Sequence, residues 1–388
     1  MAGHEVHMVT SWRHTNSTKH GWFTTNEAGI HVHWYPVPYS NHMSYAQRIK
    51  AFLSFAVAAR SKAVSLNGDV IFATSTPLTI ALPAVPASRK HKVPLVFEVR
   101  DLWPEMPIAM GALKNPVLRY AACKLEHWAY HNSAAVVALS PGMKQGVVKT
   151  GYAANRVVVI PNSSDNAEFA YNADAAHSFR QQRPWLGGSP LLVYAGTFGR
   201  VNGVGYMVEL ARALHQKYSD IKILLVGDGQ ERSAVIKAAQ QAGVYKKNLY
   251  FEEAMPKKNI PALLSAATMA SNLVTDLPQA GANSANKFFD TLAAGKPILL
   301  NHGGWMHDLV EKHGCGVAMW RKPLGDVAVQ LDAKLHDAEW LKKAGIAAGR
   351  LAEEVFARDK LAGQLMQVLE SAVAGEGHRA ESIAAGNF

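Results

Sequence analysis

The feature that most constrains the fold is an alternation of short apolar runs with helical patterns, clearest in the second half of the chain. The apolar runs have the length of buried strands and lie at residues 191–195, 221–226, 249–251, 269–274 and 297–300. Between them, apolar residues recur at helical spacing in residues 206–214, 232–242, 260–267 and 287–294. Strands that alternate with helices predict βαβ units and a parallel sheet.

The first half repeats this pattern less regularly, with apolar runs at residues 6–10, 70–73, 95–99, 135–139 and 157–160. A chain of 388 residues is longer than one hydrophobic core usually supports, so two domains are expected. Apolar periodicity lapses between residues 162 and 190, and Asn, Ser, Pro and Gly gather there. We therefore predict an N-terminal Rossmann-like domain at residues 1–165, a C-terminal one at 166–345, a closing helix at 346–374 and a mobile tail at 375–388.

Composition limits the class of protein and its compartment. Cys123 and Cys315 are the only cysteines, which excludes a disulfide framework and a cysteine-built metal site. No apolar run approaches the roughly 20 residues that span a bilayer, and the start lacks a signal-peptide pattern, so a cytoplasmic protein is expected. Residues 1–165 carry 16 Lys and Arg against 8 Asp and Glu, whereas residues 166–388 carry 24 against 22. This basic excess indicates an anionic partner for the first half, with solubility as the alternative.

Glycine-rich loops follow two predicted strands of the second half, at the strand ends where open α/β sheets bind ligands. The first loop contains Gly196, Arg200, Asn202 and Gly203, and Gly227 follows the next strand. Glycines let the backbone approach an anion, a helix N-terminus offers N–H groups, and Arg200 adds a charge for phosphate. The spacing is neither a Walker loop nor a dinucleotide fingerprint, and a plain tight turn explains it about as well.

A helix predicted to begin near Asn286 carries Lys287 and Asp290 in its first turns. A carboxylate one turn inside a helix whose N-terminus holds phosphate is well placed to accept hydrogen bonds from ribose hydroxyls. In the alternative interpretation, Asp290 is an acidic residue favoured by the helix dipole and Lys287 is solvated surface.

A dense polar cluster ends the predicted strand at residues 95–99. It consists of Arg100, Asp101, Trp103 and Glu105. Charges that crowd the carboxyl end of a strand favour a functional role. An ion-pair network of Arg100, Asp101 and Glu105 is the structural alternative.

The helical pattern at residues 44–66 mixes apolar positions such as Phe52 and Leu53 with several basic residues. This suits a helix at an anionic membrane surface, and a packed amphipathic helix is an equal alternative.

His31 and His33 are two residues apart, a spacing at which two side chains of one strand can ligate the same metal ion. The sequence has no third ligand at a spacing that would complete such a site. We interpret them as surface histidines and predict no metal site.

Six motifs together resemble the family-4 retaining glycosyltransferases of the GT-B fold, most of all bacterial enzymes of the fucosamine-transferase type. The motifs are Gly3-His-Glu-Val6, Asp101-Leu-Trp-Pro-Glu105, Leu139-Ser-Pro-Gly142, Ile160-Pro-Asn162, Leu225-Val-Gly-Asp-Gly229 and Asn286-Lys-Phe-Phe-Asp-Thr-Leu-Ala-Ala-Gly-Lys-Pro297. No single motif is decisive, but their order and spacing are specific over residues 3–372.

The resemblance implies two Rossmann-like domains that face each other across a cleft, with the nucleotide-sugar donor on the C-terminal domain and the acceptor on the N-terminal one. It places Asp290 at the second carboxylate of the Glu-x7-Glu signature, which binds the donor ribose. It implies that Lys287 and Arg200 lie near the diphosphate. The other predicted donor-binding residues are Gly196, Asn202, Gly203, Gly227, Ala254, Met255 and Asn286, and the resemblance implies that Ala254 and Met255 lie near the base.

We predict catalytic roles for Asp101, Arg100 and Arg200, in which Asp101 positions or deprotonates the acceptor hydroxyl. Trp103 and Glu105 are implied acceptor-binding residues. Family members need no metal or other cofactor, so cations and helix N-termini are expected to stabilise the leaving diphosphate.

Four departures from the family pattern stand out. The first signature carboxylate falls at Ala282, and Thr197 and Asn202 replace Arg and Lys of many relatives. Arg100 stands where many relatives have a histidine. The family usually has a strand, a glycine-rich loop and a helix before the Gly3 turn. We therefore expect a first sheet without its central strand and poor activity, with either a natural start about 30 residues upstream or a truncated chain.

The leading hypothesis is a retaining transferase that moves an N-acetylated or deoxy sugar from a UDP-sugar to a polyprenyl-diphosphate-linked saccharide. Its expected place is the inner face of the plasma membrane, in cell-surface polysaccharide synthesis. The alternatives are a UDP-sugar epimerase of GT-B architecture and an inactive nucleotide-sugar-binding relative. Nucleic acid is not an expected partner, because no basic stripe with interleaved aromatic residues occurs.

Overall fold

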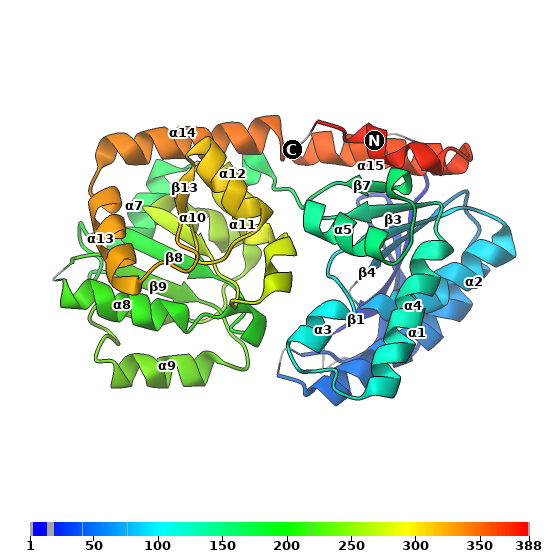
Figure 1. Cartoon of the computed structure of the whole chain (residues 1–388), viewed down its shortest axis with the longest axis horizontal. Coiled ribbons are helices and arrows are strands. Elements are labelled where there is room, and N and C mark those ends of the chain that lie inside the picture. The colour runs from blue at the N-terminus through cyan, green and yellow to red at the C-terminus, as the bar shows by residue number, and fades with distance from the viewer. Residues whose placement is uncertain (1–2, 14–18, 41, 76, 218, 387–388) are drawn as a thin grey trace. The chain divides into compact units, whose positions relative to one another are not determined.

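The computed structural model describes residues 3–13, 19–40, 42–75, 77–217 and 219–386. It divides into two compact units. The colours of Figure 1 follow the chain from blue at the N-terminus to red at the C-terminus. The N-terminal unit is Met1–Ile160 with Gln364–Phe388, and the C-terminal unit is Pro161–Gly363. The division lies near the predicted boundary at residue 165, but the segment from Gln364 belongs to the first unit rather than to the second.

The C-terminal unit is built on one sheet in the order β10-β9-β8-β11-β12-β13, and every neighbouring pair is parallel. The strands are β8 (Leu191–Ala195), β9 (Lys222–Val226), β10 (Leu249–Glu252), β11 (Met269–Asn272), β12 (Ile298–Leu300) and β13 (Gly316–Ala318). The five predicted strands are confirmed, and β13 is an addition. These strands are mainly apolar because both faces of a parallel sheet are covered by helices.

Successive β8 side chains enter different cores, as the period of two requires. Leu192 and Tyr194 pack in one core, whereas Leu191 and Val193 pack in another. Helices cover both faces (Figure 1). They are α6 (Asn166–Phe169), α7 (Ala173–Gln181), α8 (Tyr206–Gln216), α9 (Arg232–Gln241), α10 (Ile260–Ala266), α11 (Asn286–Ala293), α12 (Trp305–His313), α13 (Leu324–Leu335) and α14 (Ala338–Glu354), with short η3 (Arg200–Asn202), η4 (Lys257–Asn259) and η5 (Pro278–Ala282).

The N-terminal unit contains two separate sheets. A parallel sheet has the order β4 (Ile71–Ser75), β5 (Leu95–Val99), β6 (Ala135–Ala138), β7 (Val157–Val159). A second sheet has β1 (His7–Trp12) parallel to β3 (Ile30–Pro36), and β3 antiparallel to β2 (Phe23–Glu27). Among the residues described, no ladder joins β1 to β4, so the first sheet is divided where a central strand was predicted to be absent.

The helices of this unit are α1 (Tyr45–Ser65), η1 (Leu78–Ile80), α2 (Ala81–His91), α3 (Glu105–Ala109), α4 (Pro116–His131), α5 (Pro141–Lys149) and η2 (Ala154–Arg156). The predicted helix at residues 44–66 is confirmed as α1, which begins at a capping box. The Ser44 hydroxyl accepts from the Gln47 backbone N–H, and the Gln47 side chain accepts from the Ser44 N–H. No helix in the described part of the chain is long and apolar enough to cross a membrane.

The predictions for the C-terminal end were wrong in two respects. The predicted closing helix at residues 346–374 is instead the second half of α14 followed by a separate helix, α15 (Arg358–Val373). Phe356 is buried against Phe288 and Phe289, and Ala357 bridges to Ser164, so the backbone leaves the helical path between them. The tail from residue 375 is partly folded: η6 (Gly377–Arg379) and α16 (Ala380–Ile383) pack near β7, where Ala380 is fully buried and Lys144 pairs with Glu381.

Candidate functional site

The glycine loops that follow β8 and β9 are packed directly against each other. The Gly196 N–H donates to the Val226 carbonyl at 2.9 Å, and the Phe198 N–H donates to the Asp228 carbonyl at 2.9 Å. A Cβ on Gly227, whose φ is +146°, would lie 1.9 Å from the Gly196 carbonyl oxygen. Any side chain at Gly227 would therefore separate the two loops at the carboxyl edge of the sheet.

The rest of the first loop reaches the end of β11. Arg200 begins η3 with an exposed side chain, and Asn202 ends η3 half-buried. Gly203 has φ +55°, and a Cβ there would lie 3.2 Å from the Thr275 backbone nitrogen. The Thr275 N–H donates to the Val201 carbonyl at 2.8 Å, so η3 is held against the segment after β11.

Ala254 and Met255 follow the neighbouring strand β10. Ala254 is exposed, and Met255 packs against the core that contains Leu191 and Val193. The Gly227 N–H donates to the Glu252 carbonyl at 3.2 Å, so this segment starts beside the second glycine loop.

Lys287 lies in the first turn of α11 and points at the first glycine loop. Its Nζ lies 3.2 Å from the Tyr194 hydroxyl oxygen and 4.3 Å from the centre of the Tyr194 ring. Burial lowers the pKa of Lys287 from 10.5 to about 8. Among the described residues it has no carboxylate partner. The alternative of a solvated surface lysine is therefore wrong.

Asp290 lies one turn further along α11, and the first residue of the helix, Asn286, is exposed. The Ser164 hydroxyl donates to Asp290 Oδ1 at 2.9 Å. Burial raises the pKa of Asp290 from 3.8 to about 6, although the bond from Ser164 opposes this shift. Tyr194 and Ser164 were not predicted, because one closes an apolar strand and the other lies in a polar linker without a distinctive pattern.

The polar cluster of the N-terminal unit follows β5. Arg100 forms an ion pair with Glu98 at 3.4 Å, and its backbone N–H donates to the Ser75 hydroxyl. Glu98, which the predicted network of Arg100, Asp101 and Glu105 omitted, also accepts a bond from Thr74. Asp101 and Glu105 are exposed, and Trp103 is half-buried.

A further carboxyl lies near this cluster. Burial raises the pKa of Glu126, on α4, to about 7, and Glu105 adds to the rise. The Tyr130 hydroxyl donates to it at 3.3 Å. Glu126 was missed because a glutamate in an amphipathic helix carries no signal of its burial.

The interpretation of both strand histidines as surface residues was wrong for His33. His33 is 6% exposed and hydrogen-bonds through its two ring nitrogens to Thr24 and His7. Its two partners come from β1 and β2, the strands on either side of β3.

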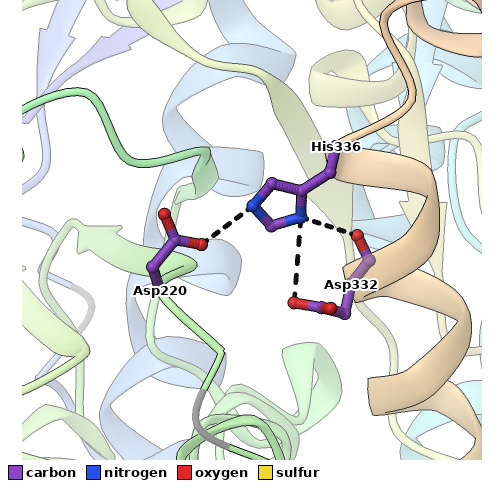
Figure 2. A group of neighbouring side chains, drawn as sticks. All are labelled: Asp220, Asp332 and His336. Carbon is purple, nitrogen blue, oxygen red and sulfur yellow. Dashed lines mark hydrogen bonds and ion pairs between the residues drawn. The ribbon is translucent and has the colours of Figure 1, made fainter.

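One cluster in the C-terminal unit combines His336 with Asp220 and Asp332 (Figure 2). His336 Nδ1 lies 2.8 Å from the Asp332 carbonyl oxygen, and Nε2 lies 2.9 Å from Asp220 Oδ1. That carbonyl and both carboxylates raise the pKa of His336, and the three side chains form a largely exposed hydrogen-bonded cluster. It joins the end of α13 to the start of β9, at the edge opposite the glycine loops.

Comparison with known proteins identifies both units. The glycosyl transferase 4-like domain matches residues 1–163, and the glycosyl transferases group 1 domain matches residues 176–348. The chain is similar to the putative colanic acid biosynthesis glycosyl transferase WcaI of Escherichia coli K12, with 25% identity over 68% of this chain and 67% of the relative. It is also similar to the 2-deoxystreptamine glucosyltransferase of Streptomyces kanamyceticus, with 26% identity over 48% of each chain. The chain thus spans about two thirds and about half of the lengths of these relatives.

Solved structures show the same fold. Sucrose-phosphate synthase from Thermosynechococcus elongatus has a TM-score of 0.75 at 16% identity, over 96% of this chain and 90% of that chain. Anabaena HepE, crystallised with UDP-glucose, has a TM-score of 0.68 at 16% identity, over 95% and 100%. WaaG, a glycosyltransferase involved in lipopolysaccharide biosynthesis, has a TM-score of 0.63 at 16% identity, over 94% and 91%. Two α/β units with parallel sheets, matched by two glycosyltransferase domains, identify the chain as a glycosyltransferase of the GT-B fold.

Proposed function

We propose that this enzyme transfers a sugar, with retention, from a UDP-sugar to a polyprenyl-diphosphate-linked saccharide in cell-surface polysaccharide synthesis. The colanic acid relative and WaaG support the polysaccharide context. HepE, whose structures contain UDP and UDP-glucose, supports the donor class. The resemblance to fucosamine-transferase-type enzymes favours an N-acetylated or deoxy sugar.

The observation that carries the proposal is Lys287, which is half-buried and whose ammonium group is desolvated beside Tyr194. A cation removed from water without an anionic partner is costly, and a phosphate group supplies the missing charge. The Lys287 Nζ would be 2.7 Å from a Cβ on Gly196, so it lies directly beside the first glycine loop. Backbone N–H groups at the start of α11 add a favourable dipole for the same anion. We therefore assign the donor diphosphate to Lys287, Gly196 and the first turn of α11.

The remaining donor contacts follow from this placement. Asp290 is one turn from Lys287, and at neutral pH its carboxylate is an acceptor for ribose hydroxyls. Ala254 and Met255, beside Gly227, are assigned to the base. Arg200 is exposed on the loop after Gly196, where a flexible guanidinium is free to move to the diphosphate. Cations and helix termini then stabilise the leaving diphosphate without a metal or other cofactor.

We assign the acceptor to the N-terminal unit, with Asp101 as the group that positions or deprotonates the hydroxyl. Arg100, Trp103 and Glu105 surround Asp101 in sequence on the loop and helix after β5. If the acceptor is lipid-linked, this unit works at an anionic membrane surface. The charge of residues 1–165 supports this location, because they contain 16 basic and 8 acidic residues.

Helix α1 is the proposed membrane contact. Phe52 is half-buried and stacks on Tyr39, but Leu53 and Val57 are 45% and 75% exposed. Lys50 and Arg60 extend the same exposed stripe at helical spacing. Exposed aliphatic side chains between two cations suit the boundary between headgroups and acyl chains.

A thermal-shift panel of UDP, GDP, ADP and UDP-sugars tests the donor, because a ligand that binds the native state raises the melting temperature. UDP should give the largest shift among the nucleotides, and Lys287→Met should remove it. Incubation of the enzyme with radiolabelled UDP-sugar and a lipid extract then tests transfer. An epimerase would alter the sugar in water alone, and an inactive relative would bind UDP without moving label.

A further inference from the structure

The C-terminal unit has a basic pocket of about 610 Å³, away from the glycine loops. It lies between α7, the turn from α10 to β11, the turn from α11 to β12, and the start of α14. Thr268 and Pro297, which line it, immediately precede β11 and β12. Gly196 and Gly227 follow their strands, so in this parallel sheet the pocket and the proposed donor site lie at opposite edges.

Two cations form the inner part of this pocket. Lys296 Nζ donates to the Ser265 carbonyl at 2.9 Å and lies 4.7 Å from the centre of the Tyr171 ring. Arg180 Nε donates to the Ala266 carbonyl at 3.2 Å. Burial and, to a smaller extent, the charge of Arg180 together lower the pKa of Lys296 from 10.5 to about 8, so the two positive charges repel each other in a partly dry environment.

The local negative charge is too small to balance them. In the part of the chain that the structure describes, neither Lys296 nor Arg180 has a carboxylate partner. No acidic residue lines the pocket, whereas Lys342 and His177 add basic groups to it. Arg180 Nη1 also donates to the carbonyls of Gly187 and Ser189, which carry no net charge. The carbonyls of Ser265 and Ala266 belong to the end of α10, and a helix C-terminus supplies only about half a negative charge.

Donors also remain available. Lys296 uses one of its three N–H groups on Ser265, and Arg180 Nη2 makes no hydrogen bond among the described residues. A phosphate dianion offers several acceptor oxygens to such donors and balances two cations. We propose that this pocket is a second anion site, which binds the phosphate group of a small ligand between Lys296 and Arg180, with Lys342 and His177 around it.

The test measures the binding of inorganic phosphate to the whole chain by isothermal titration calorimetry. Lys287→Met serves as the background, because it removes the proposed diphosphate site at the other edge of the sheet. This background should still bind phosphate. Adding Lys296→Met should raise the phosphate Kd by roughly tenfold or more, the expected effect of losing a charged hydrogen bond. The matched control is Lys343→Met, an exposed α14 lysine paired with Glu339, which should leave the Kd unchanged.

A second measurement, the protection of Lys296 from chemical modification, uses the wild-type protein and so does not depend on the folding of a variant with a changed inner residue. Acylation of lysine amines, followed by mass spectrometry, should show that phosphate slows modification of Lys296 but not of exposed Lys237. A double variant of the outer residues, Lys342→Ala with His177→Ala, should weaken that protection. If vesicles with phosphatidylglycerol protect Lys296 better than free phosphate and phosphatidylcholine vesicles do not, the phosphate comes from a lipid headgroup.

Two results would overturn the proposal. One is an absence of protection of Lys296 by phosphate and by anionic vesicles. The other is a phosphate Kd that Lys296→Met leaves unchanged in a folded protein. Either result can be told apart from a failure of the donor-site proposal, because the Lys296→Met variant should keep its thermal shift with UDP.

Discussion

Replacing Lys287 by methionine should make the unliganded enzyme more stable and remove its response to UDP. Methionine keeps most of the side-chain length and carries no charge. The pKa of Lys287 falls from 10.5 to about 8 on burial. At roughly 1.4 kcal/mol per pH unit, this corresponds to a cost of about 3 kcal/mol for the folded, charged state.

The net gain is smaller than this cost because the variant also loses the contact between Lys287 and the Tyr194 hydroxyl, worth about 1 kcal/mol. Tyr194 still donates to the Thr197 carbonyl at 2.8 Å, so its hydroxyl keeps a partner. A gain of about 2 kcal/mol corresponds to a rise of about 4–8 °C in Tm for a domain of this size. Binding-site residues of enzymes commonly lower the stability of the folded protein in return for function.

The sign of the pH dependence gives an independent check. Below pH 8 the lysine is protonated in both states, so the full cost is present. Between about pH 8 and 10.5 the folded lysine is neutral while the unfolded one still holds its proton. The unfolded state then binds more protons, and wild-type stability rises with pH. The difference between wild type and Lys287→Met should therefore be largest at pH 7 and shrink above pH 8.

Differential scanning fluorimetry at pH 7 and pH 9.5, with and without UDP, measures both effects. UDP at 100 times its Kd should stabilise the wild type by about 2.7 kcal/mol and the variant by far less. Lys237→Met, at an exposed lysine of α9, is the matched control and should change neither quantity. A less stable Lys287→Met protein that still responds fully to UDP would show that Lys287 is structural.

Three further predictions concern the other assigned residues. Asp290→Asn should raise the donor KM. The wild-type KM should rise as the pH falls through about 6, whereas the KM of the variant should not change with pH. An equally pH-dependent KM in the variant would contradict the ribose assignment. Asp101→Asn should lower kcat by ~10²–10⁴-fold and keep the UDP thermal shift, and an unchanged kcat would make Asp101 structural. Sedimentation with anionic vesicles should fall as salt rises and fall further in Leu53→Ser with Val57→Ser, whereas Val329→Ser, at an exposed valine of the C-terminal unit, should have no effect. Equal binding to neutral vesicles would contradict the electrostatic part.

The sequence predicted the C-terminal unit well because its strands are buried on both faces. Leu191–Ala195 is apolar at every position and forms β8 with the predicted bounds. The hairpin of Phe23–Glu27 and Ile30–Pro36 was missed because its strands mix polar and aromatic residues. Its two-residue turn, Ala28 and Gly29, has φ of +52° and +87°, but Ala-Gly is a weaker turn signal than Asn-Gly.

The candidate site was predictable in position but not in its contacts. Glycines after β8 and β9 were interpreted as permitting approach to an anion. The structure shows that Gly227 also permits approach to Gly196, a pairing of loops that no local pattern encodes. The burial of Lys287 was equally hidden, because it depends on Tyr194, which is 93 residues away in the chain.

Lys287 and Lys296 show why such groups escape sequence analysis and why they matter. One opens α11 and the other follows its end, so a single helix carries a desolvated lysine to each edge of the sheet. Both have their pKa lowered to about 8 by burial, and neither has a carboxylate partner among the described residues. The difference lies in their surroundings: Lys287 meets glycine loops, whereas Lys296 meets the end of α10 and a second cation. The end of a helix offsets only part of one positive charge, so the physical argument that assigns a diphosphate to Lys287 also supports the proposed anion at Lys296.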